Sequence, residues 1–190
     1  MREIALHLLD IAENSVAADG KNISVHVHED LFQDRLSACV IDDGRGMDAA
    51  TAEQVQDPFY TTRTTRNVGL GIPLLKLAAE QAEGSFSLQS EPGKGAWVEA
   101  EFRHSHIDRM PLGDLSSTFL TLLIAHPQID WTFLYRVTDK NKKSRDFLLE
   151  SAELKSELGD ISLAEPEVLK FLRGIFEEGI EEVALQPVAE

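Results

Sequence analysis

Gly69-Leu70-Gly71 is the stretch that most constrains the fold, because this glycine pair opens a helix-like pattern of apolar residues. Backbone N–H groups at the start of a helix can face an anion, and glycines let that backbone come close to it. The surrounding charge agrees with an anion site. Residues 58 to 79 contain three basic side chains and no acidic one, whereas the whole chain has a net charge of −15. A cationic segment in an acidic protein predicts a site for a small phosphate-bearing molecule and argues against nucleic acid as a partner.

Two earlier segments combine with this one. Asp10-Ile11-Ala12-Glu13-Asn14 lies on a helical pattern, and Asp42-Asp43-Gly44-Arg45-Gly46-Met47 follows an alternating, strand-like run from Leu36 to Ile41. In chain order, the three segments resemble the N box, G1 box and G2 box of the GHKL ATPase superfamily. That superfamily includes histidine kinases, gyrase, mismatch-repair ATPases and a heat-shock chaperone.

Two more segments resemble the histidine-kinase branch of that superfamily: Pro58-Phe59-Tyr60-Thr61-Thr62-Arg63 and Ser90-Glu91-Pro92-Gly93-Lys94-Gly95. The resemblance covers roughly residues 4 to 103. It implies an α+β fold, namely a two-layer α/β sandwich of the GHKL (Bergerat) type with a small α+β C-terminal extension. We expect residues 1–107 to form a histidine-kinase-like ATP-binding domain and residues 111–190 to form a small α+β domain.

Hydrophobic periodicity predicts the individual elements. The expected helices are residues 4–18, 49–56, 71–83, 112–125, 151–158 and 167–178. The expected strands are residues 23–27, 36–42, 85–90, 96–102, 129–137 and 145–150. We expect helices over one face of a mixed sheet. Gly179 is expected to end the last helix, because glycine favours helix termini.

The resemblance implies ATP and Mg²⁺ as ligands and gives roles to single residues. Asn14 would bind Mg²⁺ through its amide oxygen. Asp42 would accept a hydrogen bond from the exocyclic amino group of adenine, which guanine lacks at that position. Gly44 and Gly46 would let the backbone approach the base, and Met47 would pack near it.

The expected phosphate contacts follow in the loop from Asp57 to Val68, which we interpret as a lid, and in the glycine pair after it. Hydroxyl and guanidinium groups suit phosphate oxygens, and glycine N–H groups can line them. These candidates are Thr61, Thr62, Arg63, Arg66, Gly69, Leu70 and Gly71. Which of the two arginines contacts phosphate stays open.

Asp10 is the candidate catalytic residue, because it lies four residues before Asn14 on the same helical face. The ATP-hydrolysing branches have a glutamate at this position that activates water, and aspartate is one methylene shorter. Asp10 is therefore either the general base or a polar residue that supports the site. Glu13 is an alternative carboxylate, but it is rotated about 100° from Asn14 around the helix axis.

The sequence also bears on the cellular compartment in which we expect the protein. The single cysteine, Cys39, excludes an intrachain disulfide and fits a buried thiol. The N-terminal residues have no signal-peptide pattern, and the apolar stretch from Phe119 to Ala125 is too short to span a bilayer. We therefore expect a cytoplasmic protein that binds neither membrane nor nucleic acid.

The chain also departs from sensor kinases. The helix with Asn14 starts almost at Met1, which leaves no room for a phosphoacceptor-histidine hairpin, and the usual first strand of the domain is missing. We therefore expect transfer of the γ-phosphoryl group to a protein partner in trans, with the C-terminal region recognising that partner. A slow ATPase and a non-catalytic, ATP-dependent switch are the alternatives. The missing strand leaves a sheet edge open, which allows a homodimer.

Overall fold

Six segments of alternating apolar and polar residues form one mixed sheet in the computed structural model, which describes residues 3–57, 71–159 and 161–184. The strands are β1 Asn22–Asp30, β2 Arg35–Asp42, β3 Ser85–Glu91, β4 Gly95–Arg103, β5 Asp130–Thr138 and β6 Ser144–Glu150. Their order across the sheet is β3-β4-β2-β1-β5-β6. Strands β1 and β5 run parallel, and the other neighbouring pairs run antiparallel. The mixed sheet and the α+β class are confirmed.

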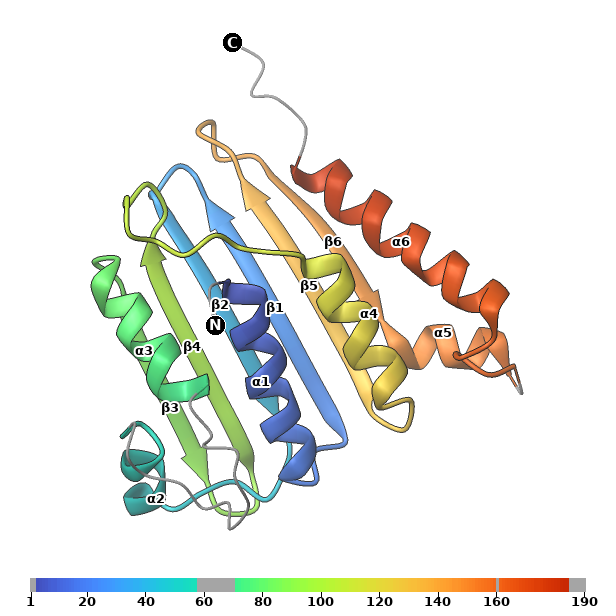
Figure 1. Ribbon diagram of the computed structural model, residues 1–190, viewed down its shortest axis with the longest axis horizontal. Helices are drawn as coiled ribbons and strands as arrows, with labels where there is room; N and C mark the ends of the chain where they lie inside the picture. Colours follow the sequence, from blue (N-terminus) through green and yellow to red (C-terminus); the bar gives the residue numbers. More distant parts are fainter. Residues whose placement is uncertain (1–2, 58–70, 160, 185–190) are drawn as a thin grey trace.

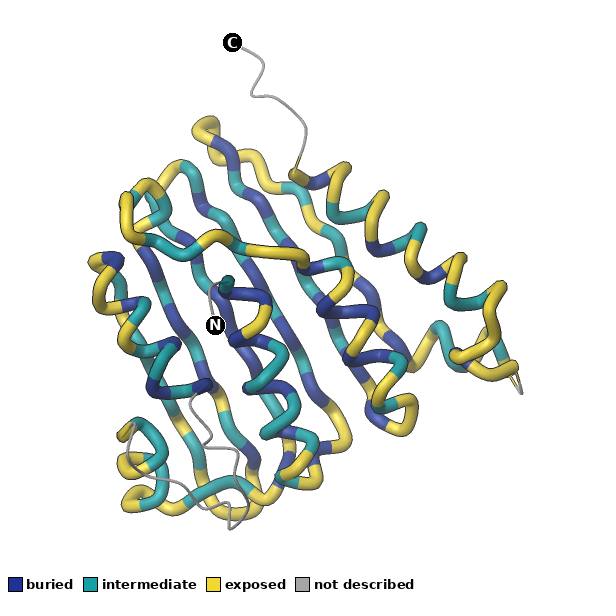
Figure 2. The backbone as a smooth tube through the Cα atoms, in the orientation of Figure 1, coloured by how far each residue is buried: buried dark blue, intermediate teal, exposed yellow. Residues whose placement is uncertain are grey.

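Four of the helices lie over the same face of this sheet, as expected (Figure 1). The helices are α1 Ile4–Ala17, α2 Ala49–Gln54, α3 Gly71–Gln81, α4 Leu115–Ala125, α5 Ser151–Leu158 and α6 Pro166–Ala184. Helices α1, α3, α4 and α6 form the covering layer, and the buried positions alternate along the strands beneath them (Figure 2). No helix in the described ranges is both long and apolar enough to cross a bilayer.

Helix α1 packs at the centre of this layer because its apolar residues recur at helical spacing. Ile4, Leu8, Ile11 and Ser15 lie on one face of the helix, and all four are buried. Each fully buried Ile or Leu side chain stabilises the fold by about 1.5–3 kcal/mol. The helix therefore has a fixed rotation, which decides where its polar residues point.

The C-terminal extension continues the sheet instead of forming a sheet of its own. Strand β5 pairs with β1 along its whole length, from Asn22 with Asp130 to Asp30 with Thr138. Aromatic rings bind the added helices to the added strands: Phe119 stacks on Phe133 with centroids 4.6 Å apart, and Phe176 meets Phe133 edge-on at 5.7 Å. The N-terminal part and the C-terminal extension share one sheet. The division into two domains at residues 107–111 stays a prediction.

The expectation of an open edge beside β1 is wrong, because β5 occupies that edge. In the described residues the outer strands are β3 and β6. A homodimer stays a prediction, and among the described residues β3 and β6 are the strands with an unpaired edge.

The expected end of the last helix at Gly179 is also wrong, since α6 continues to Ala184. A Cβ atom added at Gly179 would lie 2.2 Å from Cδ2 of Phe147 on β6. Glycine is needed here for close packing of the helix on an aromatic ring, and not as a terminator. Helix α4 likewise begins three residues later than expected, at Leu115, because the Asp114 side chain accepts a hydrogen bond from the backbone N–H of Ser117 at 2.8 Å and caps the helix.

Candidate functional site

A cavity of about 700 Å³ lies between α1, α2, the first turn of α3, the segment after β2 and the hairpin of β3 and β4. This volume is in the range of sites for small-molecule ligands, roughly 300–1,000 Å³. Its lining residues are Ile11, Asn14, Ser15, Ala17, Ala18, Asp42, Arg45, Gly46, Met47, Asp48, Thr51, Val55, Ile72, Pro92, Ala96 and Val98. The fold thus brings Asn14, Asp42, Gly46 and Met47 together, as the sequence predicted.

Asp42 is held in one orientation at the end of β2. Its Oδ2 accepts a hydrogen bond from the Ser15 hydroxyl at 2.6 Å, and its Oδ1 accepts one from the backbone N–H of Gly44 at 2.9 Å. Ser15 is buried on α1 next to Asn14. From the sequence alone, Ser15 had no assigned role at the site. The signal in the sequence was a serine at a buried position of the helix, directly after the candidate Mg²⁺ ligand Asn14, because a buried hydroxyl needs a polar partner.

The glycines of the segment after β2 allow close backbone packing. A Cβ atom at Gly44 would lie 2.7 Å from the carbonyl oxygen of Ala18, and one at Gly46 would lie 2.0 Å from that of Glu91. Gly46 also has a φ of 62°, in the left-handed region that favours glycine. The predicted approach of a base to Gly44 and Gly46 stays a prediction.

The hairpin between β3 and β4 supports the same segment. The Ser90 hydroxyl accepts a hydrogen bond from the backbone N–H of Met47 at 2.9 Å and donates one to the carbonyl of Gly95 at 2.7 Å. Ser90 therefore fixes Met47 at the cavity wall.

Asp10 does not line the cavity; it faces the first residue of α3. A Cβ atom added at Gly71 would lie 1.9 Å from Oδ2 of Asp10, so glycine is required where the two helices meet. This Oδ2 is buried and has no hydrogen-bond partner in the described part of the chain. The alternative carboxylate, Glu13, instead accepts a hydrogen bond from Nε2 of His126, the residue that caps α4, at 2.9 Å.

His7 is a buried residue that sequence reasoning did not connect with the site. Its side chain is 1% exposed, and its Nδ1 has no partner among the residues described. Burial lowers the pKa of His7, although the backbone of Gly71 and the carboxylate of Asp10 act in the opposite direction. The signal in the sequence was a histidine three residues before Asp10 on the buried helix face.

The candidates Thr61, Thr62, Arg63, Arg66, Gly69 and Leu70 lie outside the described residues, as does most of the expected lid. Gly71 opens α3, as predicted. Near this point the Lys76 ammonium donates a hydrogen bond to the Gln56 side chain at 3.1 Å. The roles given to all candidate site residues stay predictions.

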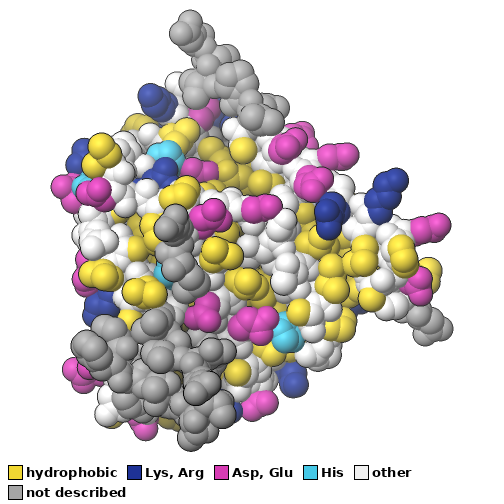
Figure 3. All heavy atoms as spheres, in the orientation of Figure 1, with side chains coloured by type: hydrophobic (Ala, Val, Ile, Leu, Met, Phe, Trp, Pro, Cys, Tyr) yellow, Lys and Arg dark blue, Asp and Glu magenta, His cyan; other side chains and the backbone are white. Residues whose placement is uncertain are grey.

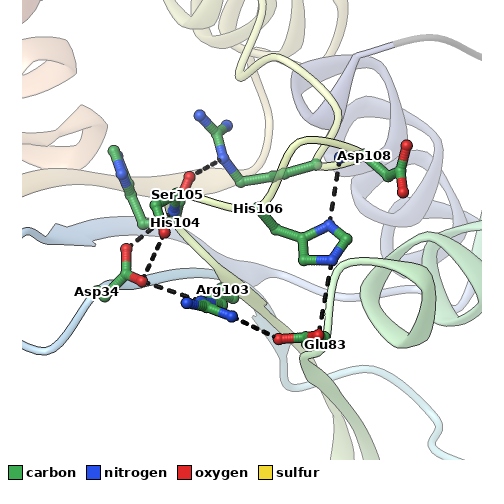
Figure 4. Close-up of polar contacts among 8 residues, drawn as sticks. Asp34, Glu83, Arg103, His104, Ser105, His106 and Asp108 are labelled. Carbon is green, nitrogen blue, oxygen red and sulfur yellow. Dashed lines mark hydrogen bonds and ion pairs between the residues drawn. The ribbon is translucent and has the colours of Figure 1, made fainter.

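A second polar group lies at the opposite end of the strands, and Figure 4 shows part of it, including Asp34, Arg103 and Ser105. We call it the far-end cluster; its members are Glu29, Asp34, Glu83, Arg103, His104, Ser105 and Tyr135. Asp34 accepts hydrogen bonds from Arg103 and from the Ser105 hydroxyl at 3.2 and 2.7 Å. Within the described ranges, no three His, Cys, Asp or Glu residues are grouped so that they could hold a metal ion.

The comparisons with known proteins agree on the N-terminal part of the chain. A family model described as histidine kinase-, DNA gyrase B-, and HSP90-like ATPase matches residues 1–106. Sensor protein kinase FleS of Pseudomonas aeruginosa is 39% identical over 88 residues, which are 46% of this chain and 22% of that protein. Sensor histidine kinase ZraS of Klebsiella oxytoca is 34% identical over 91 residues, 47% of this chain and 19% of the relative. Sporulation kinase E of Bacillus subtilis is 34% identical over 89 residues, 46% of this chain and 12% of the relative. These matches cover less than a quarter of each relative.

Proposed function

Because the chain belongs to the family of histidine kinase-, DNA gyrase B- and HSP90-like ATPases, we propose that it binds ATP with Mg²⁺ and transfers the γ-phosphoryl group to a partner protein in trans. The observation that carries this proposal is the cavity in which Asn14 and Asp42, from two separate sequence segments, meet. The similarity to sensor and sporulation kinases supports a kinase-like function.

The residues present fit the nucleotide. The cavity combines apolar walls, such as Ile11 and Val98, with few polar groups, as expected for a site that sandwiches a base. Asp42 keeps acceptor capacity beyond its bonds to Ser15 and Gly44, because each carboxylate oxygen has two lone pairs. Asp42 would therefore select adenine, and Ser15 would hold it in position.

Asn14 would hold Mg²⁺, as a neutral amide oxygen suits this hard cation. When bound, ATP supplies the transferable phosphoryl group, and Mg²⁺ neutralises negative charge on the phosphates. The chain's own task is to bind and orient. A kinase can take its nucleophile from the partner, so it needs less from Asp10 than a fast ATPase does.

The partner would be recognised by the C-terminal extension. Hydrophobic side chains gather on the helix-covered face over the C-terminal extension (Figure 3). Within this extension, Phe171 is 60% exposed and Ile161 is 56% exposed. The pair between His126 and Glu13 joins this extension to α1, the helix that carries Asn14. A partner bound there would thus act on an element in contact with the nucleotide site.

A slow ATPase is the second candidate, and one observation favours it. Oδ2 of Asp10, next to α3, is buried and has no hydrogen-bond partner among the residues described, so it is a polar atom kept where it costs stability. Such an atom is expected where a general base meets its water.

The test uses purified protein with Mg²⁺ and γ-labelled ATP, with and without cell extract from its source. Label in a partner band that disappears in Asn14→Ala supports transfer in trans, whereas free phosphate alone supports the ATPase. Asn141→Ala, in the turn after β5, is the matched control and should behave as wild type. Nucleotide binding that Asn14→Ala leaves unchanged would contradict the role of Asn14.

A further inference from the structure

The sheet face opposite α1, α3, α4 and α6 (Figure 1) has a second cavity, of about 340 Å³, on the outer side of the hairpin of β3 and β4. Trp97 lines it together with its two cross-strand neighbours, Ile41 on β2 and Gln89 on β3. Trp97 is 42% exposed. Tryptophan is enriched among the residues that carry most of the binding energy in protein interfaces. A half-exposed indole at this hollow is therefore a candidate anchor for a partner.

A carboxylate lies beside this indole. Glu99 follows Trp97 by two residues on β4, so both side chains point to the same face of the sheet, roughly 7 Å apart along the strand. Glu99 is partly buried and lies opposite Cys39 on β2 and Ser87 on β3. Among the residues that the structure describes, none donates a hydrogen bond to the Glu99 carboxylate. The two paired positions also supply it with no cation.

The basic groups around Glu99 are bound to other carboxylates. Arg35 donates a hydrogen bond to Glu101 at 2.9 Å, and Lys94, at the rim of the cavity, pairs with Glu91 at 2.5 Å. Burial raises the pKa of Glu99, and the neighbouring Glu101 acts in the same direction, whereas Arg35 opposes it. A cation brought by a partner would favour the charged form of Glu99, so the charge of this surface is complementary to a basic side chain.

Arginine is the basic side chain that fits both features of the surface. Its planar guanidinium can stack on an indole such as Trp97 and can pair with a carboxylate such as Glu99 through two parallel hydrogen bonds. A lysine ammonium is a compact point charge and cannot do both in one plane. The cavity beside Ile41 leaves room for an apolar neighbour of the arginine. The net charge of −15 adds long-range attraction for a basic partner.

We propose that Ile41, Trp97 and Glu99 form a docking surface for an extended segment of a partner protein in which an arginine lies two residues from an apolar residue. The guanidinium stacks on Trp97 and pairs with Glu99, and the apolar side chain enters the cavity beside Ile41. This inference goes beyond the proposed function, because it concerns the N-terminal part of the chain and a sheet face that the C-terminal helices do not cover. It does not depend on nucleotide binding.

The first test uses the two tryptophans of the chain, which give two indole N–H signals in a ¹H–¹⁵N NMR spectrum. The probe is the blocked peptide Ser-Leu-Ser-Arg-Ser-Leu-Ser, which has leucine two positions from arginine on either side. The Trp97 signal, assigned with Trp97→Phe, should shift to saturation, while that of Trp131, which is 1% exposed, should stay. A peptide with glutamine in place of arginine should cause no shift. Equal shifts with both peptides, or no shift at about 10 mM peptide, would overturn the proposal.

Variants test the two side chains separately. Glu99→Gln should bind the arginine peptide at least about 10-fold more weakly, since hydrogen bonds to charged groups are the strong ones. Trp97→Ala should also bind it more weakly. Leu148→Ala and Glu150→Gln change exposed residues of the same kinds on β6 and are the matched controls, which should bind as wild type does. Unchanged binding by Glu99→Gln would overturn the proposal.

A stability measurement excludes a structural role of Glu99. Its pKa is raised in the folded chain, so Glu99→Gln should unfold at pH 7 at the same temperature as wild type or at a higher one. A clear loss of stability would mean that Glu99 serves the fold and would contradict a docking role. Dimerisation of the wild type that Trp97→Ala abolishes would also overturn the proposal, because a second copy would then cover this face.

The outcomes are distinguishable from those of the proposed function. Asp42 and Ala96 line both cavities, so the peptide is titrated without nucleotide. Asn14→Ala should lose ATP and still bind the peptide, whereas Glu99→Gln should lose the peptide and still bind ATP. A wild-type chain that binds ATP and not the peptide would overturn only this inference. One that binds the peptide and not ATP would overturn only the proposed function.

Discussion

The far-end cluster and the neighbourhood of the proposed nucleotide site hold similar side chains at opposite ends of the same strands, but these side chains differ in their hydrogen bonds. In the far-end cluster, Glu29 accepts hydrogen bonds from His104 at 2.8 Å and from Tyr135 at 2.6 Å. On α1, next to the proposed site, His7 and Asp10 each have a buried atom that no described residue satisfies. The comparison teaches that paired residues of these types stabilise a fold, whereas a buried atom without a described partner needs a further explanation, as does Nε of Arg35 beside the far-end cluster.

The largest effect should come from breaking the proposed site at Asp42. In Asp42→Asn an amide donor faces the donor amino group of adenine, and we expect ATP to bind about 100-fold more weakly, since hydrogen bonds to charged groups contribute about 1.5–3 kcal/mol. Calorimetric titration measures this affinity. Asp34→Asn, the matched change in the far-end cluster, should leave it unchanged. Equal losses in both variants would mean that the two ends do not differ in function.

A change at Tyr135, in the far-end cluster, should instead lower stability and leave ATP affinity unchanged. In Tyr135→Phe the partly buried Glu29 loses its hydrogen bond from the Tyr135 hydroxyl, so the free energy of unfolding should fall by about 1–3 kcal/mol without a change in ATP affinity. Urea denaturation measures the first quantity. The double variant with Glu29→Gln should lose less than the sum of the single variants, because both changes remove the same contact. Additive losses would show that the two groups do not interact.

A pair of glycines on α6 extends the comparison from polar pairing to packing. Gly179→Ala should lower the free energy of unfolding by about 1–3 kcal/mol, because its Cβ overlaps the Phe147 ring. Gly174→Ala has open space and should instead raise it by about 0.5–1 kcal/mol through helix propensity. Thermal unfolding followed by circular dichroism compares the two. A stabilised Gly179→Ala would mean that α6 does not pack on Phe147 in this way.

The smallest expected effect is electrostatic and concerns how the depressed pKa of Glu29 changes stability with pH. Burial by itself raises the pKa of Glu29, but hydrogen bonds from His104 and Tyr135 hold it below its ordinary value. A carboxylate whose pKa is depressed by folding contributes stability above its unfolded-state pKa, near 4.5, and loses that contribution as the pH falls through the folded value. The free energy of unfolding should therefore fall more steeply below pH 4.5 in wild type than in Glu29→Gln. Equal slopes would contradict a depressed pKa.

The sequence predicted local elements well because they depend on local periodicity. Helix α1 and its buried face followed from the spacing of Ile4, Leu8 and Ile11, and the meeting of Asn14 with Asp42 followed from the family resemblance. The partners of these residues were harder to predict. The bond from Ser15 to Asp42 joins residues 27 positions apart, and periodicity carries no information on such pairs.

Non-local packing explains the failures. Gly179 was expected to end a helix on local grounds, yet its surroundings are set by Phe147 on another element. The pairing of β5 with β1 depends on a parallel crossover through α4, which alternation within β5 cannot reveal. His7 was overlooked because a histidine on a buried helix face gives no sign of whether its ring nitrogens have partners.

The pairing of β5 with β1 has a consequence for how the chain is made. Asn22 has left the ribosome long before its neighbour in the sheet, Asp130, is synthesised. Until then β1 is paired on one side only, by β2, and its other edge exposes unpaired N–H and C=O groups that favour aggregation. During translation the nascent chain therefore carries an exposed edge strand that its own C-terminal third must later cover, and a chain terminated before β5 would keep that edge permanently.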